Sequence, residues 1–216
     1  MTLKIETFND QSKGEEIFNS ISHGLGVLFA VAGTVLLIIR ACYMGSAIDI
    51  VSFSIYGFSL IELYTMSCVY HAITNIRAKK VMQVMDHCSV FILILGTYTP
   101  ICLSLLGGKI GWILFLVNAF FTILGITLNA ISVSKWHKLS LICYLAMGWS
   151  IIAAIKPLLS VINFQGFMLL LLGGILYSIG VLFYRAAKPP YMHGVWHLFV
   201  LAGSIFHYFF IYFFIL

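Results

Sequence analysis

The sequence predicts an all-α integral membrane protein, a bundle of seven transmembrane helices with the N-terminus in the cytoplasm and the C-terminus outside. Apolar residues make up 62% of the chain and charged residues 9%, whereas soluble domains carry about 25% charged residues. The apolar residues form long runs, which differ from the strands of about ten alternating residues in a membrane β-barrel. Basic residues are concentrated in alternate loops between these runs, which indicates a defined orientation across the membrane.

A crossing helix needs about 20 mostly apolar residues. We expect crossings near residues 18–40, 51–74, 82–105, 110–131, 138–159, 165–184 and 192–215. Turn-like segments separate them: GSAID, NIRAKK, LLGGK, VSKWHK, VINFQG and RAAKPP. Pro189 and Pro190 divide the last two helices, because proline cannot continue a hydrogen-bonded turn but is tolerated in a first turn. Residues 1–16 then form a polar cytoplasmic arm, and residues 17–216 form one transmembrane domain.

The first sixteen residues are polar and of mixed charge, without the basic start and small-residue cleavage site of a secretory signal. We therefore expect the first crossing to serve as its own uncleaved insertion signal. With seven crossings, nine basic residues share the side of the N-terminus: Lys4, Lys13, Arg77, Lys79, Lys80, Lys135, Lys138, Arg185 and Lys188. Three lie on the other side: Arg40, Lys109 and Lys156. This bias places the N-terminus in the cytoplasm.

Composition also excludes some classes of partner and site. The net charge of +5 comes from residues in short loops, which is a topology signal and predicts no nucleic-acid partner. The five cysteines show no CxxC spacing, and most fall inside apolar runs, so we interpret them as buried thiols that pack as small hydrophobic groups.

Under this topology, polar residues far apart in the sequence reach the same depth in the inner leaflet. They are His23 at the start of the first crossing, His71 at the end of the second, Asp86 and His87 at the start of the third, and His193 and His197 at the start of the last. Residues four apart lie about 40° apart on one helix face, with a rise of about 6 Å. That spacing joins His193 to His197, Ser67 to His71, and Glu15 to Asn19 and His23. His207 lies about 15 Å deeper and about 80° round the helix, outside this cluster.

His71, His193 and His197 together could bind zinc, and three histidine ligands leave one position open for water, as in catalytic zinc sites. Asp86 could then act as a general base, and Ser67 could stabilise a developing oxyanion. Simpler interpretations stay open at this stage. Intramembrane histidines also join helices by hydrogen bonds, and Asp86, Glu15 and Asn19 could cap helices. Iron or manganese could also occupy an imidazole site.

The stretches EEIFNSISHG, SCVYHA, MDHCSVFILILGTYTP and HGVWHLFVLAGSIFH resemble the PAQR family, in its bacterial haemolysin III-like branch. The match runs from about Glu15 to His207 and includes E-x-x-x-N-x-x-x-H, S-x-x-x-H followed by Asp, and H-x-x-x-H. The family is similar to adiponectin and progestin receptors and, more distantly, to alkaline ceramidases. The resemblance implies seven crossings, zinc on His71, His193 and His197, Asp86 holding the zinc-bound water, and Ser67 beside it. It also implies a multi-pass protein of a bacterial cell membrane, in a branch associated with membrane homeostasis.

Three functions compete at this point. The first is a zinc-dependent hydrolase that cleaves a lipid amide within the inner leaflet, as a ceramidase does, with a membrane lipid as its substrate. The second is a sensor of lipid or fatty acid, or a membrane-homeostasis protein, in which zinc is structural. The third is a transporter that uses His207 as a relay, for which the sequence shows neither broken helices nor paired half-repeats. The branch name implies cytolysis, but no residues here suggest a secreted pore-former.

Overall fold

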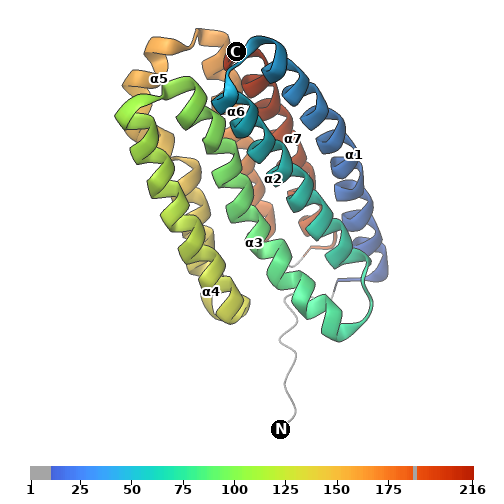
Figure 1. Cartoon of the computed structure of the whole chain (residues 1–216). Coiled ribbons are helices and arrows are strands. Elements are labelled where there is room, and N and C mark those ends of the chain that lie inside the picture. Colours follow the sequence, from blue (N-terminus) through green and yellow to red (C-terminus); the bar gives the residue numbers. More distant parts are fainter. Residues whose placement is uncertain (1–10, 187–188) are drawn as a thin grey trace.

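The computed structural model describes residues 11–186 and 189–216, and every regular element in these ranges is a helix. In chain order they are α1 (Lys13–Met44), α2 (Ala47–Ala72), α3 (Ile76–Pro100), the π-helical turn η1 (Ile101–Leu106), α4 (Gly108–Gly148), the 3-10 turn η2 (Ser150–Ala154), α5 (Ile155–Val161), α6 (Phe164–Arg185) and α7 (Met192–Phe214). The long helices pack side by side in one bundle (Figure 1). The predicted all-α class is confirmed.

Six helical segments within the described residues are long and apolar enough to cross a membrane, with the segment Gly108–Val161 counted as one of 54 residues. Their outer surfaces carry large apolar side chains. Leu28, Phe29, Phe120 and Ile123 each expose more than 60% of their surface. Such continuous apolar exposure would be unfavourable in water and suits contact with lipid. The helices therefore have the character of a multi-pass membrane bundle.

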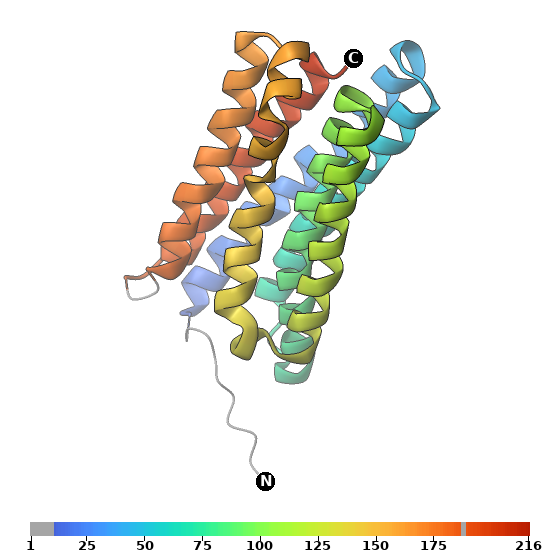
Figure 2. The same cartoon turned by 90° about the vertical axis from the view of Figure 1, so that its left-hand side faces the viewer.

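The 54-residue segment is bent back on itself at Ser132, whose φ of −169° and ψ of 110° are extended and not helical. The side-chain amide of Asn118 donates a hydrogen bond to Ser150 Oγ at 3.0 Å. In a straight helix these residues would lie about 48 Å apart. Figure 2 shows the two arms, coloured green and gold, running alongside each other. The arms correspond to the predicted segments 110–131 and 138–159.

Helix α1 begins at Lys13, five residues before the predicted crossing and inside the predicted polar arm. A capping box explains this early start. The backbone N–H of Glu15 donates to Ser12 Oγ at 3.3 Å, and the Glu15 carboxylate accepts from the Ser12 N–H at 2.9 Å. These bonds satisfy amide groups that lack partners within the helix. Residues 1–10 of the predicted arm and Lys188, which is predicted to be cytoplasmic, lie outside the described residues.

Two irregular turns interrupt helices that the sequence led us to expect as unbroken. One is η1, directly after Pro100, whose missing N–H removes a helical hydrogen bond. The other is η2, where Tyr98 supplies the missing partners. Its hydroxyl donates to Gly148 O at 2.8 Å and accepts from the Ile151 N–H at 2.9 Å. The Tyr98 hydroxyl thus satisfies backbone groups at η2 within the protein, as non-helical backbone at membrane depth requires.

The arrangement of the helix ends positions the histidines. The start of α1, the α2–α3 turn, the bend within α4, the end of α6 and the start of α7 lie at one end of the bundle, opposite the C-terminus (Figures 1 and 2). Helix α1 packs against both α2 and α7. Because its first turn also bonds to His71 and to Tyr191, the end of α2 and the start of α7 come together beside it. We call this the inner end, after the predicted cytoplasmic side.

The described cysteines form no disulfide, and Cys88, Cys102 and Cys143 are buried, while Cys42 is exposed. The interpretation of most thiols as packing groups therefore agrees with their surroundings.

Candidate metal centre

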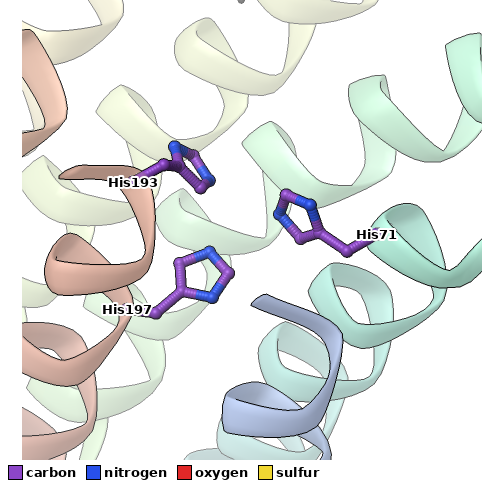
Figure 3. A group of neighbouring side chains, drawn as sticks. All are labelled: His71, His193 and His197. Carbon is purple, nitrogen blue, oxygen red and sulfur yellow. The ribbon is translucent and has the colours of Figure 1, made fainter. Parts of the chain in front are cut away.

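Three imidazoles from two helices converge at the inner end of the bundle. His71 lies in the last turn of α2, and His193 and His197 lie one turn apart at the start of α7. One nitrogen from each ring can be chosen so that all three lie within 4.8 Å of one another. Figure 3 shows the rings directed toward a common centre. His71 and His197 are buried and His193 is half-buried, so the group could hold a metal ion away from bulk water.

Glu16 on α1 fixes the orientation of the His71 ring. Its carboxylate accepts a hydrogen bond from His71 Nδ1 at 2.7 Å and also pairs with the Lys79 ammonium at 2.7 Å. A carboxylate only accepts hydrogen bonds, so the His71 proton lies on Nδ1 and the Nε2 lone pair faces the other two rings. Such a carboxylate–histidine pair commonly orients metal ligands and raises their basicity.

His197 is fixed in the same way by the backbone of α1. Its Nδ1 lies 3.3 Å from the carbonyl oxygen of Asn19 and 3.3 Å from Ser22 Oγ. The carbonyl can only accept, so Nδ1 donates and Nε2 keeps its lone pair. The His23 ring stacks on the His197 ring, with ring centroids 3.6 Å apart and planes 9° apart. His23 therefore supports a ligand ring and does not belong to the group of three.

The donor atoms fit a metal. His71 Nε2 and His193 Nε2 are buried and have no hydrogen-bond partner. A buried polar nitrogen without a partner costs free energy, unless an ion or another group satisfies it. Neutral imidazole nitrogens of this kind are favoured zinc ligands, and three of them leave a coordination position open. The chemistry of the donor set thus agrees with the cofactor that the sequence indicates, while other divalent metals accept the same ligands.

A small cavity of about 50 Å³ adjoins the imidazoles and contains the predicted catalytic side chains. Ser67 and Asp86 both line it, together with His23, His193 and His197. Ser67 lies one turn before His71 and is buried. The structure thus brings the predicted hydroxyl and carboxylate to the same cavity as two of the predicted ligands. Their catalytic roles stay predictions.

The N-terminal motif has a structural role that its spacing did not reveal. The Glu15 carboxylate accepts from the backbone N–H of Tyr191 at 2.8 Å, in addition to its capping bonds. Tyr191 has a left-handed backbone with φ of 63° and is the N-cap residue of α7. Asn19 is fully buried and donates to Gln11 Oε1 at 2.8 Å. The Glu15 side chain therefore attaches α1 to the start of α7. Asn19 contacts α7 through its backbone carbonyl at His197, while its side chain binds the segment before α1.

Sequence reasoning missed Glu16. Both glutamates of the EE pair fall on the helical stripe that leads to Asn19 and His23, at three and four residues before Asn19. Spacing alone cannot choose between them, and only the packing of α1 against α2 shows which one reaches His71. Ser22 was also missed, since a serine in a helix gives no signal of its own.

His207 lies away from the centre, as predicted. Its Nε2 donates to the Leu170 carbonyl at 3.1 Å, which joins α7 to α6. His87 and His137 lie on either side of the Tyr184 hydroxyl, at 3.3 and 3.5 Å.

Comparison with known proteins finds one matching family, and the match includes the helices that carry the three imidazoles. The model of the family described as haemolysin-III related matches residues 11–208. The chain is 42% identical to Hemolysin-3 of Bacillus cereus over 94% of this chain and 92% of the relative. It is 45% identical to the Hemolysin-3 homolog of Bacillus subtilis (strain 168) over 88% and 89% of the two chains. It is 26% identical to the human Monocyte to macrophage differentiation factor over 90% and 82%.

The family match covers the helices that carry the three imidazoles, and the two bacterial relatives align along most of their length. Together with the apolar helices, these findings identify a multi-pass membrane protein. The chain belongs to the haemolysin-III-related family, the PAQR family.

Proposed function

We propose that this protein is a zinc-dependent hydrolase that cleaves a lipid amide at the inner face of a bacterial cell membrane. The observation that carries the proposal is the group of three imidazoles, two of which, His193 and His197, line one cavity with Asp86 and Ser67. Two buried, unpartnered Nε2 atoms support a resident metal. The open fourth position supports catalysis rather than a purely structural site.

The proposed topology has seven crossings with the N-terminus in the cytoplasm. The bend at Ser132 supports counting Gly108–Val161 as two crossings, because its arms run back along each other. The basic residues of the described chain support the orientation, since Arg77, Lys138 and Arg185 are all at or near the inner end of a helix.

A zinc ion held at this centre would polarise a carbonyl and lower the pKa of bound water to about 7. The residues of the chain supply the remaining requirements. Asp86 offers a carboxylate that can accept a proton within the cavity. Ser67 offers a hydroxyl that can donate to a developing oxyanion. Glu16 and the Asn19 carbonyl hold two ligand rings in the tautomer that metal binding requires.

The proposal is tested by metal analysis and by turnover on the same preparations. Purified protein should carry close to one zinc per chain and release fatty acid from ceramides or other lipid amides. Asp86→Asn should abolish turnover and retain zinc. If it removes zinc or unfolds the protein, the role given to Asp86 is wrong. His193→Ala should lose metal, whereas His207→Ala should retain it, because His207 bonds to Leu170 and not to the centre.

A second candidate is a lipid or fatty-acid sensor with a structural zinc. It is favoured by the way the centre joins three helices, with ligands on α2 and α7 and their hydrogen-bond partners on α1. A ligand that displaces one of these helices would change the packing of all three. Stoichiometric zinc without turnover on any lipid amide would favour this function over the hydrolase.

A further inference from the structure

The small cavity that Ser67, Asp86, His193 and His197 line is called the metal cavity below. A larger cavity of about 400 Å³ lies beside it. We call it the vestibule. Polar and basic side chains make up much of its lining, among them Tyr70, Gln83, His87, His137, Lys138 and Arg185. His193, His87, Leu141 and Tyr184 line both the vestibule and the metal cavity. A molecule in the vestibule would therefore lie against a proposed metal ligand.

The vestibule is positively charged. Lys138 on α4 and Arg185 at the end of α6 contribute two permanent cations, and His87 and His137 add two imidazoles. Among its described lining residues there is no carboxylate. Asp86 lies behind His87, with Oδ2 3.8 Å from His87 Nδ1, and lines the metal cavity instead. The two neighbouring cavities thus differ in charge, and the vestibule suits an anion.

Hydrogen bonds fix several polar groups of the vestibule in place. His87 Nδ1 donates to the Gln83 carbonyl at 2.8 Å, so its Nε2 accepts from the Tyr184 hydroxyl at 3.3 Å. Helices α3 and α6 are joined through this contact. Gln83 and Tyr70 add neutral hydrogen-bonding groups to the wall. Leu141 and Ile142 form an apolar wall beside them. The cavity combines cations, fixed polar groups and an apolar side, which matches an amphipathic ligand.

Basic residues at the inner end of a membrane protein also serve orientation, so their presence alone does not make a binding site. The positions of the side chains distinguish a basic residue that serves orientation alone from one that could also bind a ligand. Lys135 lies three residues from Lys138, but its ammonium lies over the Trp136 ring, 5.0 Å from the centroid, and it does not line the vestibule. Lys138 and Arg185 come from different helices and meet at one cavity.

We propose that the vestibule binds the phosphate group of an anionic lipid and so sets which lipids reach the metal cavity. Arginine pairs with phosphate through two parallel N–H bonds, and lysine adds a point charge. The volume of the vestibule, about 400 Å³, is larger than a carboxylate group alone would occupy. Its apolar wall would contact the part of the acyl chains next to the head group. The inference rests on the proposed function only where it places the lipid head group beside a metal centre. Binding of the phosphate group can be measured without any turnover of lipid.

The test compares two ether-linked lipids that differ only in phosphate, a dialkyl phosphatidic acid and the corresponding dialkylglycerol. Neither has an acyl bond to cleave. Binding is measured by native mass spectrometry of the zinc-loaded protein in neutral detergent, and inorganic phosphate is added as a competitor in a third arm. The double variant carries both Lys138→Gln and Arg185→Gln. The control is Lys135→Gln, which removes a nearby cation that does not line the vestibule.

We expect the phosphatidic acid to bind at least tenfold more tightly than the dialkylglycerol. The double variant should lose this preference and Lys135→Gln should keep it, because a charge-assisted bond to phosphate contributes about tenfold or more. Competition by millimolar inorganic phosphate would show that the phosphate group alone is recognised. Absence of competition, with the preference intact, would show that the lipid body is needed as well.

Equal affinity for the two lipids, or equal loss in the double variant and in Lys135→Gln, would overturn the proposal. Zinc content is measured on each preparation. If the double variant loses the preference for phosphate and keeps zinc, the vestibule proposal is supported whatever the metal centre does. If the wild type carries no zinc, the proposed function fails and the vestibule proposal is not affected.

Discussion

The carboxylate of Glu16 lies between the His71 ring and the Lys79 ammonium, at 2.7 Å from each. It holds the His71 proton on Nδ1, and thereby leaves Nε2 free toward the centre. Glu15, its neighbour, points to Tyr191 instead. Two adjacent residues of one type thus have separate roles, one toward a ligand ring and one toward the start of α7.

This difference gives a matched pair of substitutions. Glu16→Gln should weaken metal affinity by about 10- to 100-fold, because the amide supports the imidazole less strongly than the carboxylate. Glu15→Gln should leave metal affinity within a few-fold, since residue 15 does not contact His71 and the glutamine oxygen can still accept from the Tyr191 N–H. Chelator competition on the purified variants measures both. Equal affinities for Glu16→Gln and the wild type would contradict the role given to Glu16.

At the scale of elements, the approach of α7 to α1 depends on Gly194, which lies between the candidate ligands His193 and His197. A Cβ at this position would lie 2.5 Å from the Phe18 ring and 3.0 Å from Asn19 Oδ1. The first of these is too close for any side chain. The absence of a side chain at Gly194 therefore lets His197 reach the Asn19 carbonyl.

Substituting Gly194 by Ala should move α7 away from α1. We expect a destabilisation of about 1–3 kcal/mol from overpacking and a loss of metal affinity, because the His197–Asn19 contact is already 3.3 Å long. Gly148→Ala is a suitable control, since a Cβ there meets nothing within 4 Å. Thermal unfolding and metal titration of both variants give the comparison. Similar values for the two would show that the α1–α7 contact tolerates a methyl group.

The bend at Ser132 determines how many times the chain crosses the membrane. If both arms cross, a reporter fused after Lys135 should face the cytoplasm and one fused after Asn163 should face outside. Paired phosphatase and fluorescent-protein fusions at the two positions measure this. Both reporters on the same side would mean that Gly108–Val161 does not form two crossings, and the proposed seven-crossing topology would fail.

At the scale of the whole molecule, a metal at the centre would connect helices that are distant in the sequence. His71 and His193 are more than one hundred residues apart, and α1 packs between their helices. An ion that binds the folded state alone stabilises it by about 2.7 kcal/mol when its free concentration is one hundred times its Kd. Stability should therefore depend on metal.

Removal of metal by a chelator should lower the unfolding temperature of the wild type, and zinc should restore it. The variant His193→Ala should show a lower unfolding temperature without chelator and little further change with it. Circular dichroism on heating, in the same detergent throughout, measures the difference. If the wild type is shown to carry zinc and a chelator does not change its unfolding temperature, the metal does not link the helices as proposed.

Much of this protein follows from its sequence. The low charge and the long apolar runs require helices, because backbone groups in lipid must find partners within their own segment. The HxxxH spacing places two imidazoles on one face of α7, and the loop charges predict that His71 and Asp86 share their depth. These are local periodicities and a one-dimensional charge pattern, so the sequence by itself determined the helical class, the ligand candidates and their common end of the bundle.

Only the tertiary structure decided the rest. It selected Glu16 over Glu15 as the partner of His71, stacked His23 on His197 rather than grouping it with the three candidate ligands, and folded Gly108–Val161 into two arms. It also gathered Lys138 and Arg185 at a vestibule that shares His193 with the metal cavity. The physical reason is that each choice depends on rotation and distance between helices. Side-chain packing between segments sets those quantities, and no periodicity within one segment records them.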